Sequence, residues 1–257
     1  EADNGAFKGT ARTTWFNRVL AAGGGSGTPL RTALDDAGKY FQNTSAAGPY
    51  GPQSGSNQLA CRQNFAILTT DGFWNQAWTD TIGNADGTDG PSIFNPRDNT
   101  NVVRYTPTDP FRDGPTANYT STLGDIAMHY WKNDLRTDLP NLVPATSGNP
   151  AFWQHMSTYG VSIGLRGTLD QGTVADITQD GRPRKAGVAV NWPDPTDAEN
   201  AERIDDLLHA AVNGRGEFIA ATDASRFADQ LTGLLNQIQS RLAAGSNVAV
   251  NSASFQS

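Results

Sequence analysis

Apolar residues recur with two different spacings along the chain, and the alternation of these spacings predicts the fold class. Short apolar runs at 65–69, 159–165 and 217–221 are typical of strands, the first of them buried on both faces. Apolar residues three and four positions apart predict helices over 12–21, 28–41, 122–135, 197–213 and from 223 onward. Strands that alternate with helices predict an α/β protein with a doubly wound, mostly parallel sheet.

Capping signals indicate where two of these helices begin. Thr28 and Pro29 predict the start of the second helix, because Thr is a good N-cap and Pro fits the first helical position. Thr122 and Asp125 have the spacing of a capping box at the start of the third helix. These signals are local, so they predict helix ends without reference to the rest of the fold.

Two long insertions interrupt the alternation. Residues 73–118 are polar, aromatic and rich in turn formers, with one short strand expected at 102–105. Residues 167–195 form a second insertion, with hairpin character around 180–181. Connections of this length are usually functional, so both insertions are expected to decorate the surface of the sheet.

Composition and charge narrow the class of partner. The 257 residues are 37% hydrophobic and 18% charged, which fits one globular domain with polar loops. The formal net charge is −7, and no basic face is available to neutralise a phosphate backbone, so nucleic acid is not expected as a partner. No apolar stretch is long enough to span a bilayer, and no signal peptide opens the sequence.

Cys61 is the one cysteine of the chain, so the sequence contains neither an internal disulfide nor a paired-cysteine metal site. In a cytosolic protein it would be an ordinary buried thiol. In an exported protein it would be a reactive thiol, either free or paired with a partner outside this chain.

Oxygen-bearing side chains at two places are candidate metal ligands. Thr28 at a helix start and Asp71 at the end of a strand are hard ligands suited to Mg²⁺ or Ca²⁺, although both also fit as a cap and a turn residue. Asn84, Asp86 and Asp89 lie among glycines, as in calcium-binding loops, but an ordinary turn has the same composition.

The usual catalytic signatures are missing from the sequence. The run 23–27 is rich in glycine, but no lysine follows it and it comes after a helix, so it does not predict a phosphate loop. The histidines at 129, 155 and 209 lie on separate elements with no paired metal-ligand spacing. Asp205 and His209 could meet across one helical turn, which a helix-stabilising pair also explains. These observations predict a protein that is not an enzyme.

Several strings together resemble one bacterial family, the PilY-type adhesin and assembly proteins of type IV pili. They run along nearly the whole chain: GTPLRTAL at 27–34, CRQN at 61–64, TDGFWN at 70–75, GNAD at 83–86, YWKNDLR at 130–136, WQHM at 153–156 and IDDLLHAAVNGRG at 204–216.

The resemblance implies a von Willebrand A-like (Rossmann-like) domain, here spanning 1–244. Thr28 and Asp71 match two positions of the metal-dependent adhesion site of such domains. The Asp-x-Ser-x-Ser string that supplies the other ligands is missing, and 1–11 contain no run suited to a first central strand. The domain is therefore expected to be incomplete at its N-terminus, with Mg²⁺ or Ca²⁺ bound only in a longer protein. Residues 248–255 are β-like, and 245–257 are expected to begin a linker to a following module.

The resemblance also implies function. It predicts a non-enzymatic, exported domain at the bacterial cell surface, at the pilus tip or outer membrane, that acts in pilus assembly, twitching motility, adhesion and surface sensing. Its expected partners are minor pilins and tip components, with an unknown surface or host ligand. Two alternatives stay open: an exported carbohydrate-active or hydrolytic enzyme, and a purely structural pilus scaffold.

Overall fold

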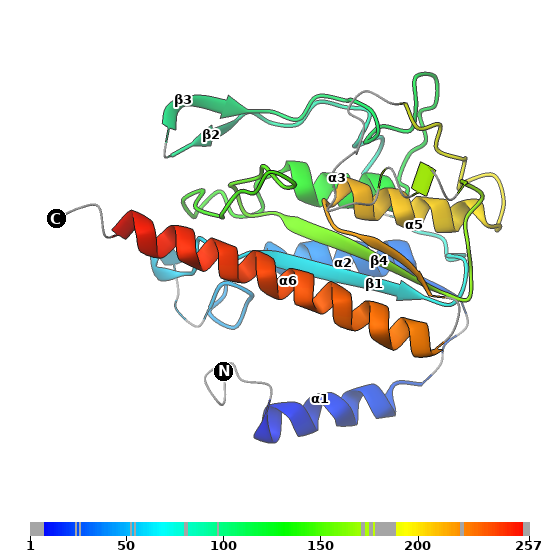
Figure 1. Ribbon diagram of the computed structural model, residues 1–257, viewed down its shortest axis with the longest axis horizontal. Helices are drawn as coiled ribbons and strands as arrows, with labels where there is room; N and C mark the ends of the chain where they lie inside the picture. Colours follow the sequence, from blue (N-terminus) through cyan, green and yellow to red (C-terminus); the bar gives the residue numbers. More distant parts are fainter. Residues whose placement is uncertain are drawn as a thin grey trace.

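A three-stranded parallel sheet forms the centre of the molecule (Figure 1). The computed structural model describes residues 8–23, 25, 27–51, 53, 55–79, 82–96, 98–170, 173–174, 177, 189–221 and 224–253. The sheet contains β1 (Asn64–Thr70), β4 (Met156–Ile163) and β5 (Phe218–Ala221) in the order β1-β4-β5. Both pairings are parallel, so the predicted α/β class with a parallel sheet is confirmed.

Helices cover both faces of this sheet (Figure 1). On one face lie α2 (Leu30–Phe41), α3 (Leu123–Lys132) and α5 (Glu202–Asn213), which share one core with inward side chains of β1 and β4. On the other face, α6 (Ala224–Ala253) packs its apolar side chains on β4 and β5. Alternate residues of β4 face the two cores, because successive side chains of a strand point to opposite sides.

The central strand β4 is almost wholly buried, whereas β1 is half buried. Ile67 of β1 remains 37% exposed, so the expectation that this strand is buried on both faces is wrong. The reason is its position: within the described residues β1 pairs with β4 alone and lies at an edge of the sheet. At Gly160 of β4, a Cβ would lie 3.0 Å from the Leu207 side chain, so glycine lets α5 approach closely.

The insertion 73–118 contains a hairpin of two strands where one was expected. β2 (Ile93–Asn95) and β3 (Asp98–Val103) pair antiparallel and project away from the sheet (Figure 1). A short 3₁₀ helix, η2 (Gly55–Asn57), lies in the connection before β1. The hairpin character expected around 180–181 falls outside the described residues.

Two predicted helix starts are shifted in the structure. The side chain of Thr28 does not cap α2; the backbone N–H of Thr28 instead donates to Asn75 Oδ1 at 2.7 Å, which ties the helix start to a distant loop. The helix expected from 197 begins at Glu202. The Asn200 side chain accepts a hydrogen bond from the backbone N–H of Glu202 at 2.8 Å, and this local contact fixes the start of the helix.

The first and last helices of the chain also show features that the sequence pattern did not predict. The expectation of β-like structure over 248–255 is wrong for its described part, because α6 continues to Ala253. A single glycine such as Gly245 costs a helix only about 1 kcal/mol, and no proline comes after it to end the helix. At the other end of the chain, α1 (Gly9–Ala21) contains no buried residue.

Truncating Leu207 tests the packing of α5 on β4. Leu207 is fully buried, so Leu207→Ala should lower the free energy of unfolding by about 2–5 kcal/mol. Urea denaturation followed by tryptophan fluorescence measures the change. Leu235→Ala on α6 is the control: its leucine is 44% exposed, and the expected change is within about 0.5 kcal/mol. Equal losses of unfolding free energy in the two variants would show that the packing of α5 on β4 stabilises the protein no more than the exposed leucine does.

Candidate functional site

The first turn of α3 is held by two buried carboxylates. Asp206 accepts hydrogen bonds from the backbone N–H groups of Leu123 and Gly124, both at 3.0 Å. Asp125 forms the predicted capping box with Thr122, which is confirmed. These N–H groups have no partner within the helix, and the helix dipole favours negative charge there. Burial raises the pKa of Asp206 to about 6, while the backbone hydrogen bonds oppose this rise.

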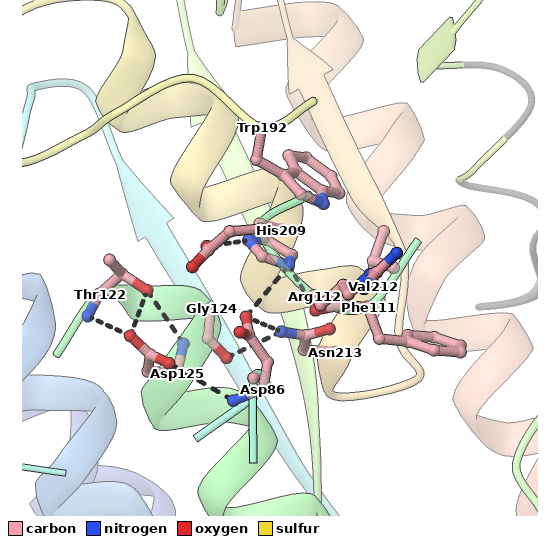
Figure 2. Close-up of polar contacts among 12 residues, drawn as sticks. Asp86, Phe111, Arg112, Thr122, Gly124, Asp125, Trp192, His209, Val212 and Asn213 are labelled. Atoms are coloured by element: carbon pink, nitrogen blue, oxygen red, sulfur yellow. Dashed lines mark hydrogen bonds and ion pairs between the residues drawn. The ribbon is translucent and has the colours of Figure 1, made fainter. Parts of the chain in front are cut away.

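Asp86 lies beside this helix end and is fully buried. Its Oδ2 accepts a hydrogen bond from Asn213 Nδ2 at 3.1 Å and lies 3.4 Å from His209 Nε2. Its Oδ1 is buried and has no hydrogen-bond partner. Burial, and then the charges of Asp125 and Asp113, raise the pKa of Asp86 to about 9. Figure 2 shows the Asp86 side chain pointing toward His209 and Asn213.

His209 of α5 is held in one orientation and one tautomer. Its ring stacks on Trp192 with centroids 4.1 Å apart. Nε2 lies 2.8 Å from the backbone carbonyl of Phe111, and because a carbonyl only accepts, Nε2 carries the hydrogen. Burial lowers the pKa of His209 to about 3, so Nδ1 keeps a free lone pair. A Cβ on Gly124 would lie 2.7 Å from Nδ1, so glycine is required beside this atom.

Asp113, from the insertion 73–118, completes the group. Its Oδ2 accepts a hydrogen bond from the backbone N–H of Tyr119 at 2.8 Å, and its Oδ1 lies 4.0 Å from His209 Nδ1. Burial raises the pKa of Asp113 to about 7, and the charge of Asp125 adds to this rise. A narrow pocket with no room for a free water molecule reaches Asp113, Asp206 and His209.

One ligand atom from each of Asp86, Asp113 and His209 lies within 4.8 Å of the others, and all three residues are buried. We call these three residues the 86–113–209 cluster. Within the described residues, neither of its carboxylates forms an ion pair with a lysine or arginine. Such a cluster can hold either an extra proton or a metal cation.

Of the three residues predicted in the loop at 84–89, the structure brings only Asp86 into this cluster. Asn84 accepts from the backbone N–H of Gly87, and the exposed Asp89 pairs with Arg104. The ammonium group of Lys132 lies against the loop instead. It donates to the carbonyls of Ala85 and Thr88 and to the Thr88 hydroxyl, so oxygens of the loop already bind a cation of the chain itself.

Thr28 lies beside the loop that follows β1, in which Asp71 is the first residue. A Cβ on Gly72 would lie 3.2 Å from Thr28 Oγ1, which places the hydroxyl beside the residue that follows Asp71. The Asp71 side chain is exposed. Trp74 anchors this loop: its indole N–H donates to Asp206, and the guanidinium groups of Arg31 and Arg203 each lie 4.0 Å from its ring.

Sequence reasoning missed Asp113, Asp206 and His209 as members of one site. The expected pair of Asp205 and His209 does not form, because Asp205 accepts from Thr168. A usable signal was present in α5: Asp206, His209 and Asn213 are spaced three and four apart, so they share one face of the helix. No sequence signal pointed to Asp113, which reaches the site from a long loop.

Comparisons with known proteins extend over nearly the whole chain. The sequence is 32% identical over 271 residues to the type IV pilus biogenesis factor PilY1 of Pseudomonas aeruginosa strain PAK, and 31% identical to that of strain PAO1. The corresponding protein of strain UCBPP-PA14 is 29% identical over 265 residues. Each match covers 96% of this chain but only 22% of the relative. The resemblance to PilY-type proteins is confirmed.

No family model and no solved structure matches the chain. Within the described residues, none of the helices combines the length and apolar character needed to cross a membrane.

The raised pKa of Asp86 predicts how stability depends on pH. A carboxyl group with a higher pKa in the folded state binds more protons there, so its contribution to stability is lost as pH rises toward the folded pKa. In protein treated with a chelator, the free energy of unfolding should fall by about 1–3 kcal/mol between pH 6.5 and 8.5. Denaturant unfolding at several pH values measures this. The fall of the unfolding free energy with pH should become smaller in Asp86→Asn. It should persist in the control Asp138→Asn, which changes an exposed aspartate. If Asp86→Asn keeps the pH dependence of the wild type, the assignment to Asp86 is wrong.

Cys61 is free and exposed in the structure, so its thiol should react in the folded protein. We expect about one thiol per chain to react with a disulfide reagent at nearly the same rate before and after unfolding. Absorbance of the released thiolate measures both rates, and Cys61→Ser sets the background. Protection of the thiol until the protein unfolds would show that Cys61 is covered.

Proposed function

This chain has a PilY-type sequence over 96% of its length, and we propose that it is a binding and assembly domain of a type IV pilus protein. The observation that carries this proposal is the match to PilY1 proteins, whose name assigns them to type IV pilus biogenesis. The chain spans about a fifth of the length of these relatives. The proposal therefore concerns the contribution of this region to a larger protein.

In this role the region would act outside the cell, at the pilus tip or outer membrane, and contact minor pilins and a surface ligand. The acidic net charge of −7 supports a protein or glycan partner over nucleic acid. Assembly of pili is the broader role; adhesion, surface sensing and twitching motility are the finer roles that we propose with it.

The carboxyl end of β1 is the place where we expect a ligand to bind. Ligands of parallel α/β sheets bind outside the carboxyl ends of the strands, where Asp71 follows β1 and the Thr28 hydroxyl lies beside Gly72. Together they offer two protein oxygens, whereas Ca²⁺ takes six to eight ligands in all. We therefore propose that they form part of an adhesion site that binds Mg²⁺ or Ca²⁺ only when a longer protein supplies more ligands.

The burial of the 86–113–209 cluster supports a non-enzymatic role over the rival hydrolase. A glycoside hydrolase needs two carboxylates that flank an accessible sugar, separated by roughly 5 to 9.5 Å. Asp86 is fully buried, and the pocket that reaches Asp113 and His209 has no room for a water molecule. A histidine with a strongly lowered pKa also cannot act as a general acid near neutral pH.

The proposal is tested in the bacterium with the full-length protein. A strain that lacks the gene is complemented with wild type, with Leu207→Ala or with Leu235→Ala in this region. We expect Leu207→Ala to reduce pilin in the sheared surface fraction at least several-fold, because the region loses packing energy, while Leu235→Ala restores pili. Immunoblots of sheared and whole-cell fractions measure assembly. Normal piliation without the gene would overturn the pilus role.

A second experiment separates binding from the two alternatives. The purified chain is applied to arrays of glycans and of minor pilins, and released sugars are measured in parallel. Saturable binding that leaves the glycan intact supports the binding domain. Turnover of a glycan would identify the hydrolase, and binding to pilins alone would favour the purely structural scaffold.

A further inference from the structure

Three buried carboxylates around the start of α3 differ in how their oxygens are hydrogen-bonded. Both oxygens of Asp206 accept hydrogen bonds, from two backbone N–H groups and the Trp74 indole. Both oxygens of Asp125 also accept, from Thr122 and from the backbone around Ala85. Asp86 differs, because its Oδ1 is buried without a partner. The first two carboxylates are therefore explained by helix capping, and Asp86 is not.

The nearest cationic side chains are used elsewhere. Lys132 donates to the loop carbonyls of Ala85 and Thr88. Arg215 donates to the carbonyls of Val212 and Asn213, and its guanidinium lies 3.6 Å from the ring centres of both Phe111 and Trp131. Neither forms an ion pair with Asp86 or Asp113 in the described part of the chain. A buried carboxylate without a cation is costly, so Asp86 must either take up a proton or bind a cation.

Both ring nitrogens of His209 lie near carboxylate oxygens: Nε2 lies 3.4 Å from Asp86 Oδ2, and Nδ1, which carries the lone pair, lies near Asp113. Nδ1 lies 4.0 Å from Asp113 Oδ1, and metal–ligand bonds of about 2.0–2.2 Å place ligand atoms roughly 3–4.4 Å apart. The N–H of Nε2 is held by the Phe111 carbonyl, which is the outer contact that fixes the tautomer of metal-binding histidines. Figure 2 shows the side chains of Asp86 and His209 converging from two different segments.

The geometry points to a divalent metal site formed by Asp86, Asp113 and His209. An imidazole nitrogen with two carboxylates suits Zn²⁺ or Mn²⁺ better than Ca²⁺, which requires six to eight oxygens. Asp86 would supply both of its oxygens as the third and fourth donors, since its Oδ1 is buried without a hydrogen-bond partner. The ion would join two places in the insertion 73–118, at Asp86 and Asp113, to helix α5, a structural role that goes beyond the proposed function.

Metal content and thermal stability of the whole chain test this inference. Purified protein is analysed for metal by mass spectrometry, then unfolded in chelator and refolded with Zn²⁺, Mn²⁺ or Ca²⁺. We expect about one Zn²⁺ or Mn²⁺ per chain and a Tm raised by roughly 5 °C or more, because binding to the folded state alone stabilises it. Ca²⁺ should have little effect. Co²⁺ bound in place of Zn²⁺ should show a visible absorption spectrum that reports nitrogen and oxygen ligands.

Isosteric variants locate the ion. Asp113→Asn keeps an oxygen for the Tyr119 N–H and should fold, but its affinity should fall at least about tenfold. Asp89→Asn is the matched control, since Asp89 is exposed and lies outside the cluster, and it should bind as wild type does. Asp71→Ala tests whether the ion binds at the other candidate site instead. Far-ultraviolet circular dichroism confirms that each variant is folded before its affinity is compared.

Three results would overturn the inference. The first is a folded wild-type chain that gains no stability from Zn²⁺ or Mn²⁺ at millimolar concentration. The second is binding that Asp71→Ala abolishes and Asp113→Asn does not, which would place the ion at Thr28 and Asp71. The third is a Tm raised by Asp86→Asn and unaffected by metal, which would show that the cluster holds a proton.

Discussion

The carboxylate of Asp206 is the interaction on which the arrangement of the helical face depends. It binds the first turn of α3 through two backbone N–H groups and the loop after β1 through the Trp74 indole, while its own residue lies in α5. One side chain therefore fixes three segments that are far apart in sequence. Burial raises its pKa, so these hydrogen bonds must offset the cost of keeping the group charged.

The positions of His209 and of the Trp74 loop depend on these hydrogen bonds of Asp206. Because α3 and α5 are held at one point, His209, one turn beyond Asp206, is placed against Gly124 and under the Trp192 ring. The same anchor holds the Trp74 loop, whose neighbour Asn75 binds the backbone of Thr28. The exposed corner at Thr28 and the buried cluster are thus two ends of one connected set of hydrogen bonds.

The features that could be predicted from the sequence are those governed by neighbouring residues. The strands around 65–69, 159–165 and 217–221 result from apolar runs, and the capping box at Thr122 closes within one helical turn. Thr28 fails as a cap because a contact with a residue 47 positions away determines its backbone. The 86–113–209 cluster could not be predicted from the sequence for the same reason. Asp86 is hydrogen-bonded to Asn213, which is 127 positions away, and no local spacing of residues predicts such a contact.

At the loop 84–89 the backbone oxygens are bound by a cation that belongs to the protein itself. The ammonium group of Lys132 is attached to α3, and it donates to the carbonyls of Ala85 and Thr88. Unlike the ion of a calcium-binding loop, this ammonium group cannot be removed by a chelator. The backbone of the loop is therefore held without dissolved calcium, and a chelator could act here only on an ion bound at the Asp86 side chain.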